Sequence, residues 1–268
     1  MSFVTTPDGA RLRLSDRGAG PEIVLVHGWK MSHRIWDRTI AALEDRFRVV
    51  AFDLRGMGES DKPNGRYDFD ELSDDLGFLL GALGLDDVTL VGWSMGCSVS
   101  LEYLRRDGSR VGRLVLANGP IRLARTDDFP WTMTQAELDA YVDDVERRWP
   151  EAERAFTEAA FHAPVESVVD WIHSIALQTP LDVVLKTVRA QGRLDHRGLL
   201  GELRVPVLAL YGRHDPYYPV ELAAYIAERA PRGRALVLEQ SAHFPFLEAD
   251  ADRFNAAIAQ FAMGGEAE

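Results

Sequence analysis

Short apolar runs alternate along this chain with amphipathic segments. The runs are rich in β-branched residues and end near a glycine or a polar turn, as buried parallel strands do. They cover residues 22–28, 48–53, 88–92, 113–118, 205–212 and 234–238. Helix-period segments include residues 69–83, 97–105, 220–229 and 250–262. This alternation predicts βαβ units and an α/β fold, in which a mostly parallel sheet carries helices on both faces. Residues 5–14, with a Pro-Asp-Gly turn, predict an antiparallel hairpin that leads into the sheet.

Residues 120–193 break this alternation, because they contain no convincing strand. The sequence from Thr134 to Glu137 is a capping box, which predicts the start of a helix that runs towards Trp149 and is closed or kinked at Pro150. Further helical patterns cover residues 151–161, 165–178 and 181–191. We therefore predict a core domain of residues 1–119 and 194–268, and an all-helical lid of residues 120–193. Such a lid would cover the carboxyl edge of the sheet, where open α/β folds bind their ligands.

A candidate nucleophile lies between a predicted strand and a predicted helix. Gly92-Trp93-Ser94-Met95-Gly96 matches the pattern G-x-S-x-G, which is weak alone and gains weight from this strand–turn–helix context. The two glycines permit a tight turn that projects the serine, and the following helix favours negative charge near Ser94. The alternative is a glycine turn with an incidental serine.

A base and an acid are expected at the ends of later strands. His243 follows the last predicted strand, and no other histidine in the sequence has this placement. Asp215 follows the preceding strand, so the order Ser94, Asp215, His243 is the order typical of a strand–turn–helix serine nucleophile. Asn118 occupies the other strand end where an acid could stand, but an amide cannot serve. A packed loop histidine and an Asp-Pro turn residue are the structural alternatives.

Two backbone N–H groups are candidates for stabilising an oxyanion. One belongs to Met95, directly after the nucleophile, and the other to Trp29, in the loop after the first long strand. Gly28 would let that loop turn its N–H groups towards Ser94. Trp29 could instead serve only to pack beneath the lid.

Composition and charge exclude several classes of protein. The formal net charge of −12 disfavours a nucleic-acid partner, because an acidic surface repels phosphates. No apolar stretch is long enough for a membrane-spanning helix, and the first residues lack the pattern of a secretory signal. With one cysteine, Cys97, the chain cannot form an internal disulfide, so we expect a cytoplasmic protein, with a disulfide-free secreted one as the alternative.

Taken together, these motifs resemble the α/β-hydrolase superfamily, and most closely its carboxylesterase and cofactor-free haloperoxidase (perhydrolase) branch. The resemblance covers both ends of the chain and leaves only the lid without a signature. It implies an eight-stranded α/β-hydrolase sheet, the serine triad and acyl-ester chemistry. Lys30 departs from the pattern, since relatives often carry proline or a small residue there, and Cys97 replaces a usual glycine. The segments that carry the resemblance are residues 26–29, 52–60, 92–96, 205–215 and 242–245.

The sequence thus predicts a serine hydrolase that cleaves a small carboxylic ester or lactone without metal or cofactor. Ser94 argues against epoxide hydrolases and haloalkane dehalogenases, which need a carboxylate nucleophile. Thioesterase, C–C hydrolase, perhydrolase and hydroxynitrile lyase activities remain alternatives, as does a ligand receptor with little turnover. The sequence specifies neither the substrate nor an oligomeric state. Aromatic residues that we expect in a compact substrate pocket, several of them equally compatible with the core, are Trp29, Trp93, Trp131, Tyr217, Tyr218 and Phe244.

Overall fold

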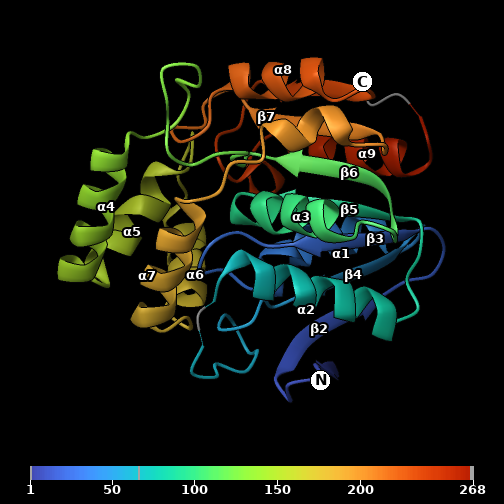
Figure 1. Cartoon of the computed structure of the whole chain (residues 1–268), viewed down its shortest axis with the longest axis horizontal. Helices are drawn as coiled ribbons and strands as arrows, with labels where there is room; N and C mark the ends of the chain where they lie inside the picture. Colours follow the sequence, from blue (N-terminus) through green and yellow to red (C-terminus); the bar gives the residue numbers. More distant parts are fainter. Residues whose placement is uncertain (1, 66, 266–268) are drawn as a thin grey trace.

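The computed structural model describes residues 2–65 and 67–265. Within them, one eight-stranded sheet has the strand order β1-β2-β4-β3-β5-β6-β7-β8 (Figure 1). The pairs β1–β2 and β2–β4 are antiparallel, and all other neighbours are parallel. The predicted mostly parallel sheet is therefore confirmed. The strands are β1 (Ser2–Thr5), β2 (Arg11–Arg17), β3 (Glu22–Val26), β4 (Arg48–Phe52), β5 (Val88–Trp93), β6 (Val111–Ala117), β7 (Val207–Gly212) and β8 (Gly233–Leu238).

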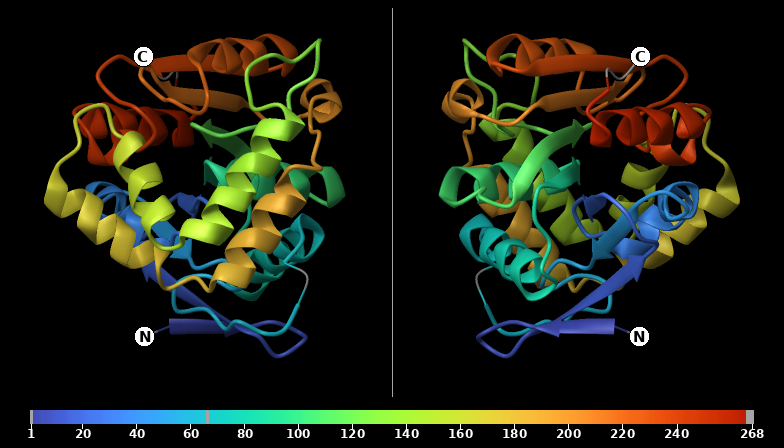
Figure 2. Two further views of the ribbon diagram at one scale, coloured as in Figure 1. Left: turned by 90° about the vertical axis from the view of Figure 1, so that its left-hand side faces the viewer. Right: turned by 90° about the vertical axis from the view of Figure 1, so that its right-hand side faces the viewer.

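Helices cover both faces of the sheet. Helices α2 (Phe69–Ala82), α3 (Met95–Arg106) and α8 (Val220–Arg229) pack on one face, and α1 (Asp37–Leu43) and α9 (Ala251–Ala262) pack on the other (Figure 2). Sequence patterns did not single out α1, because its seven residues are too short to show a clear helical period.

The central strands are buried on both faces of the sheet, which explains why their sequences are continuously apolar. Every residue of β5 is buried, and the consecutive residues Leu90 and Val91 belong to the cores on opposite faces. Since successive side chains of a strand point to opposite faces, a strand covered on both faces needs apolar residues at every position.

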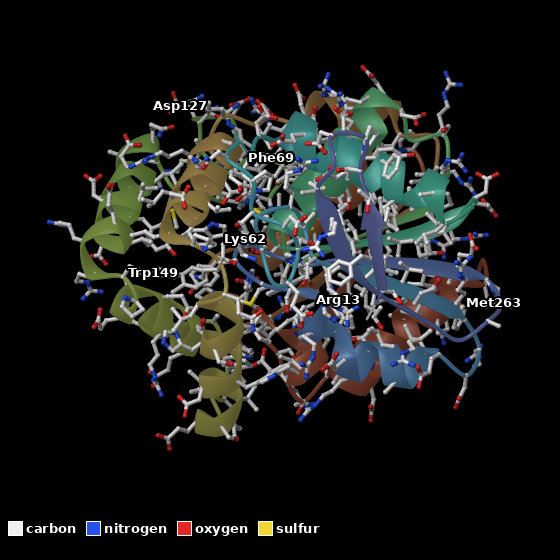
Figure 3. The ribbon with its side chains drawn as sticks, turned by 90° about the horizontal axis from the view of Figure 1, so that it is seen from below. Arg13, Lys62, Phe69, Asp127, Trp149 and Met263 are labelled. Atoms are coloured by element: carbon white, nitrogen blue, oxygen red, sulfur yellow. The ribbon has the colours of Figure 1, made fainter. Side chains whose placement is uncertain are left out.

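Four helices are inserted between β6 and β7, and we call residues 120–193 the helical insertion. Thr134 caps the first of these helices in a capping box with Glu137, as predicted. The insertion lies beyond the carboxyl ends of the parallel strands (Figure 1). Seen from below, Trp149 of the insertion and Met263 after α9 lie at opposite ends of the molecule (Figure 3). The inserted helices are α4 (Gln135–Arg148), α5 (Glu151–Ala159), α6 (Glu166–Ala176) and α7 (Leu181–Gln191).

None of the helices in the described part of the chain is long and apolar enough to cross a membrane.

Candidate active site

Ser94 sits in a strained turn between β5 and α3. Its backbone has φ 54° and ψ −122°, a conformation that non-glycine residues rarely adopt. The turn is tight because Gly96 packs directly on the backbone of β3, where a Cβ atom would lie 2.3 Å from the Val26 carbonyl oxygen. Strain of this kind persists only where the surrounding structure holds it, and it is concentrated at functional sites. The local sequence thus produces a strained turn that places Ser94, itself only 9% exposed, at the carboxyl end of β5.

His243 lies in the loop between β8 and α9 and reaches the serine. Its Nε2 atom is 3.1 Å from Ser94 Oγ, and the residue is only 2% exposed. The loop is fixed at both backbone polar groups of His243. The N–H donates to the carbonyl of Ala160 at 3.0 Å, and the carbonyl accepts from Trp93 Nε1 at 2.7 Å. The imidazole is therefore held beside the hydroxyl by contacts from both the core and the helical insertion.

Asp215 follows β7 and contacts the far side of the imidazole. Its Oδ2 atom lies 2.9 Å from His243 Nδ1. Its Oδ1 atom accepts from the backbone N–H groups of Tyr217 at 2.8 Å and Tyr218 at 3.2 Å. With both oxygens bound, the carboxylate has a fixed orientation, which suits a group that selects one tautomer of a histidine.

Asn118 is a further contact to this carboxylate that sequence reasoning missed. Its Nδ2 atom donates to Asp215 Oδ2 at 2.6 Å and to the Ala242 carbonyl at 3.2 Å. The sequence identified Asn118 only as a residue that cannot act as the acid. Its place at the end of β6, next to the strand that carries Asp215, was the available signal for a supporting contact.

The loop after β3 passes directly against the nucleophile. A Cβ atom on Gly28 would lie 2.7 Å from the Trp93 ring and 3.0 Å from Ser94 Cβ, so only glycine allows this approach. A turn from Gly28 to Met31 follows, closed by the Met31 N–H on the Gly28 carbonyl at 3.2 Å. The Trp29 amide is therefore adjacent to the point of contact with Ser94. The Met95 amide is at the first residue of α3, where N–H groups have no partner within the helix.

His27 holds the base of this loop without taking part in the cavity. Its Nδ1 donates to the Gly28 carbonyl at 2.7 Å, and its Nε2 accepts from the Leu54 N–H at 2.9 Å. Acceptance at Nε2 requires the neutral ring with its proton on Nδ1, and complete burial lowers the pKa of His27 to about 4. His27 thus ties the loop after β3 to the loop after β4.

This buried histidine predicts a loss of stability in acid. Because the pKa falls from 6.5 in the unfolded chain to about 4 in the fold, the unfolded state binds the extra proton between those values. The free energy of unfolding should therefore decrease by about 3 kcal/mol as the pH falls from 7 to 4. Urea denaturation of wild type and His27→Gln across this range checks the effect. The glutamine variant does not titrate here, so an equal pH dependence in both proteins would contradict the prediction.

A cavity of about 60 Å³ lies between the strand ends and the helical insertion, next to Ser94 and His243. Of the aromatic residues expected there, all but Trp131 line it: Trp29, Trp93, Tyr217, Tyr218 and Phe244. The insertion also contributes eight lining residues that the sequence did not single out: Leu123, Thr132, Met133, Leu138, Tyr141, Phe156, Val188 and Gln191.

Trp131 is a correction to the predicted pocket. It packs instead against Phe129 and Tyr225, with ring centres 5.1 Å and 4.8 Å away. An aromatic residue of the insertion can bury its surface against the core as readily as against a ligand, and here Tyr225 of α8 provides the partner.

In the described residues, no group of three or more His, Cys, Asp or Glu side chains is arranged to hold a metal ion. Cys97 is fully buried beneath the nucleophile turn, where its Sγ lies 3.1 Å from the Gly92 carbonyl oxygen. Burial raises the pKa of this thiol well above its usual range, so it remains protonated and packs between α3 and the sheet.

Comparison with known proteins identifies the family. The model of the family described as alpha/beta hydrolase fold matches residues 21–250. The chain belongs to the α/β-hydrolase family. This confirms the predicted resemblance to the superfamily. The predicted esterase and haloperoxidase-like branch is also confirmed, because relatives of this chain are named as esterases and haloperoxidases.

Two relatives and one solved structure illustrate this placement of the α/β-hydrolase. The pimeloyl-[acyl-carrier protein] methyl ester esterase of Vibrio atlanticus is 32% identical, over 92% of this chain and 96% of that protein. The non-heme chloroperoxidase CPO-A1 of Kitasatospora aureofaciens is 30% identical, over 97% of this chain and 99% of that protein. An esterase structure from Exiguobacterium antarcticum has a TM-score of 0.93 at 28% identity and covers 98% of this chain and 99% of its own.

Proposed function

We propose that this α/β-hydrolase is a serine hydrolase that cleaves a small carboxylic ester or lactone through an acyl-enzyme. The observation that carries the proposal is one continuous path of contacts: Ser94 Oγ to His243 Nε2 at 3.1 Å, and His243 Nδ1 to Asp215 Oδ2 at 2.9 Å. Nucleophile, base and orienting acid in this arrangement form a triad that can activate a serine hydroxyl.

In the first half-reaction, Ser94 Oγ attacks the substrate carbonyl carbon while His243 Nε2 accepts the hydroxyl proton. The carbonyl π electrons move onto oxygen, and the Trp29 and Met95 N–H groups stabilise that charge. When the electrons return, the bond to the leaving alkoxide breaks, and His243 gives that oxygen its proton. Water then attacks the acyl-enzyme by the same route, which releases the carboxylic acid and regenerates Ser94. In a lactone, acid and alcohol leave as one molecule.

The cavity lining supports a compact and largely apolar substrate. Trp29 and Trp93 lie close to the nucleophile turn, and Tyr141, Phe156 and Val188 contribute apolar surface from the helical insertion, which we propose acts as a lid. The similarity to proteins named as esterases favours ester substrates. The relatives named as haloperoxidases favour a second candidate activity, in which hydrogen peroxide replaces water in attacking the acyl-enzyme and yields a peracid.

A fluorophosphonate probe tests the proposal directly, because it reacts only with an activated serine. We expect one label per chain, and peptide mass spectrometry should place it on Ser94. A side-by-side panel of short-chain esters, aryl esters, thioesters and lactones, each with water and with added hydrogen peroxide, then separates the candidate activities. A folded protein that remains unlabelled and inactive on the whole panel would favour the receptor alternative.

A further inference from the structure

The oxyanion loop is attached to the helical insertion by a lysine that is almost completely buried. Lys30 directly follows Trp29, is 1% exposed, and has a backbone φ of 55°, in the left-handed region. Burying a lysine is costly unless its charge is paired, and a left-handed conformation adds strain at a side chain of this size. Both the burial of this charge and the left-handed backbone must therefore be compensated by contacts around Lys30.

Among the described residues, the Lys30 ammonium is compensated by side chains of α5 and by the neighbouring Trp29 ring. Its Nζ lies 3.6 Å from Glu153 Oε1 and 4.1 Å and 4.3 Å from the ring centres of Phe156 and Trp29. The Glu153 side chain is fully buried, and it also accepts from Thr157 Oγ1 at 2.6 Å and contacts His173 Nδ1. Burial lowers the pKa of Lys30 to about 8, which leaves the ammonium charged at neutral pH.

Other contacts from the insertion reach the same two loop residues. The Trp29 Nε1 donates to the Val184 carbonyl at 3.0 Å and to Thr187 Oγ1 at 3.1 Å, both on α7. The Lys30 carbonyl accepts from Thr179 Oγ1 at 3.4 Å. Both the backbone and the side chains of the loop are therefore fixed by elements that lie outside the α/β core.

The segment around α5 also contacts the loops that carry the acid and the base. Tyr217, which lies two residues after Asp215, donates from Oη to the Phe156 carbonyl at 2.9 Å. The Ala160 carbonyl, just after α5, accepts from the His243 N–H. One short helix thus touches all three loops that surround Ser94. It holds the loop after β3 through the ion pair of Glu153 with Lys30 and through Phe156, whose ring contacts both Lys30 and Trp29.

We infer that Lys30 is a positioning residue, whose ion pair with Glu153 fastens the Trp29–Lys30 loop to α5 so that closure of the insertion and assembly of the oxyanion site are one event. The inference rests on the proposed function. Lys30 does not line the cavity within the described chain, so it acts through the Trp29 amide and not on the substrate. The cavity of about 60 Å³ is lined in part by residues of the insertion, so we expect the insertion to move when a substrate enters. That movement would release the loop.

The test separates positioning from mere stabilisation by using two readouts on Lys30→Met. The kcat for p-nitrophenyl acetate should fall about 10- to 100-fold, with KM changed less than about threefold, because misplacing one oxyanion donor weakens the transition state selectively. The inhibition constant of phenylboronic acid, whose adduct with Ser94 is tetrahedral, should rise by a similar factor. A purely structural role would reduce the active fraction, which titration with the fluorophosphonate measures, and would leave that inhibition constant unchanged.

Two further variants complete the design. Glu153→Gln keeps the size of the side chain and removes its charge, so it should show the same fall in kcat and the same rise in the boronate inhibition constant. If Lys30→Met does not fold, Glu153→Gln tests the inference in its place. Lys186→Met is the control: it removes an exposed lysine of the helical insertion, whose Nζ lies 3.0 Å from Asp182 Oδ2. It should leave both kcat and the boronate inhibition constant unchanged. If wild type is active and labelled while Lys30→Met and Glu153→Gln match its kcat and boronate inhibition, the inference is wrong and the proposed function stands. An inactive, unlabelled wild type would instead refute the proposed function.

Discussion

Replacing Ser94 with alanine is expected to lower kcat/KM for p-nitrophenyl acetate by about 10⁴- to 10⁶-fold, because the reaction then has no nucleophile. Residual hydrolysis would come from the oxyanion site and substrate binding alone. The fold should survive, since the only side-chain hydrogen bond of Ser94 within the described residues is the one to His243 Nε2. Initial-rate kinetics with circular dichroism on the same samples measure both quantities.

Ser100→Ala is the matched control for this variant. Ser100 lies on α3, the helix that follows Ser94, and is fully buried. Among the described residues its hydroxyl bonds only the Gly96 carbonyl, at 2.8 Å, and Ser100 does not line the cavity. We expect its kcat/KM to stay within about threefold of wild type, since it loses one local hydrogen bond. Turnover by folded Ser94→Ala at more than a few per cent of the wild-type rate would mean that another group attacks the substrate.

The second large effect is expected for Asp215→Asn, which should lower kcat by about 10⁴-fold. The carboxylate accepts the Nδ1 proton of His243, so Nε2 is free to accept the proton of Ser94. An amide that presents its NH₂ group to Nδ1 stabilises the opposite tautomer, in which Nε2 already carries a proton. Asn118 would also lose a charged acceptor, although its second bond to the Ala242 carbonyl remains available.

The control for Asp215→Asn removes a different buried carboxylate close to the base. Asp250 is 7% exposed and accepts from the Gln240 N–H at 2.7 Å and Ser241 Oγ at 2.9 Å, without contact to the imidazole. Asp250→Asn should therefore cost less than about tenfold in kcat. The acid assignment fails if Asp215→Asn is no more impaired than this control when both proteins are folded.

Much of this architecture could be predicted because it is encoded locally. A strand buried on both faces must be apolar at every position, so β5 and β7 stand out in the sequence. The glycine at position 96 is required by backbone contact, and this requirement appears as a motif. Ser94, Asp215 and His243 follow β5, β7 and β8, which belong to the parallel part of the sheet. The topology therefore brings them to a common edge although they are far apart in the chain.

Other features depend on which surfaces meet, and no local pattern reports that. Trp131 and Phe156 are both aromatic residues of the insertion, yet Trp131 packs on Tyr225 while Phe156 lines the cavity. The sequence excluded Asn118 as the acid, and only the pairing of β6 with β7 shows that its side chain contacts Asp215.

The sequence alone therefore determined the fold class, the nucleophile turn and the three side chains proposed for catalysis, since periodicity, glycine contacts and strand order are local or topological properties. Only the tertiary structure decided what surrounds them. Lys30 shows the reason most clearly, because its partner Glu153 is more than a hundred residues away in the sequence. Whether a buried charge is stable depends on the groups that surround it after folding.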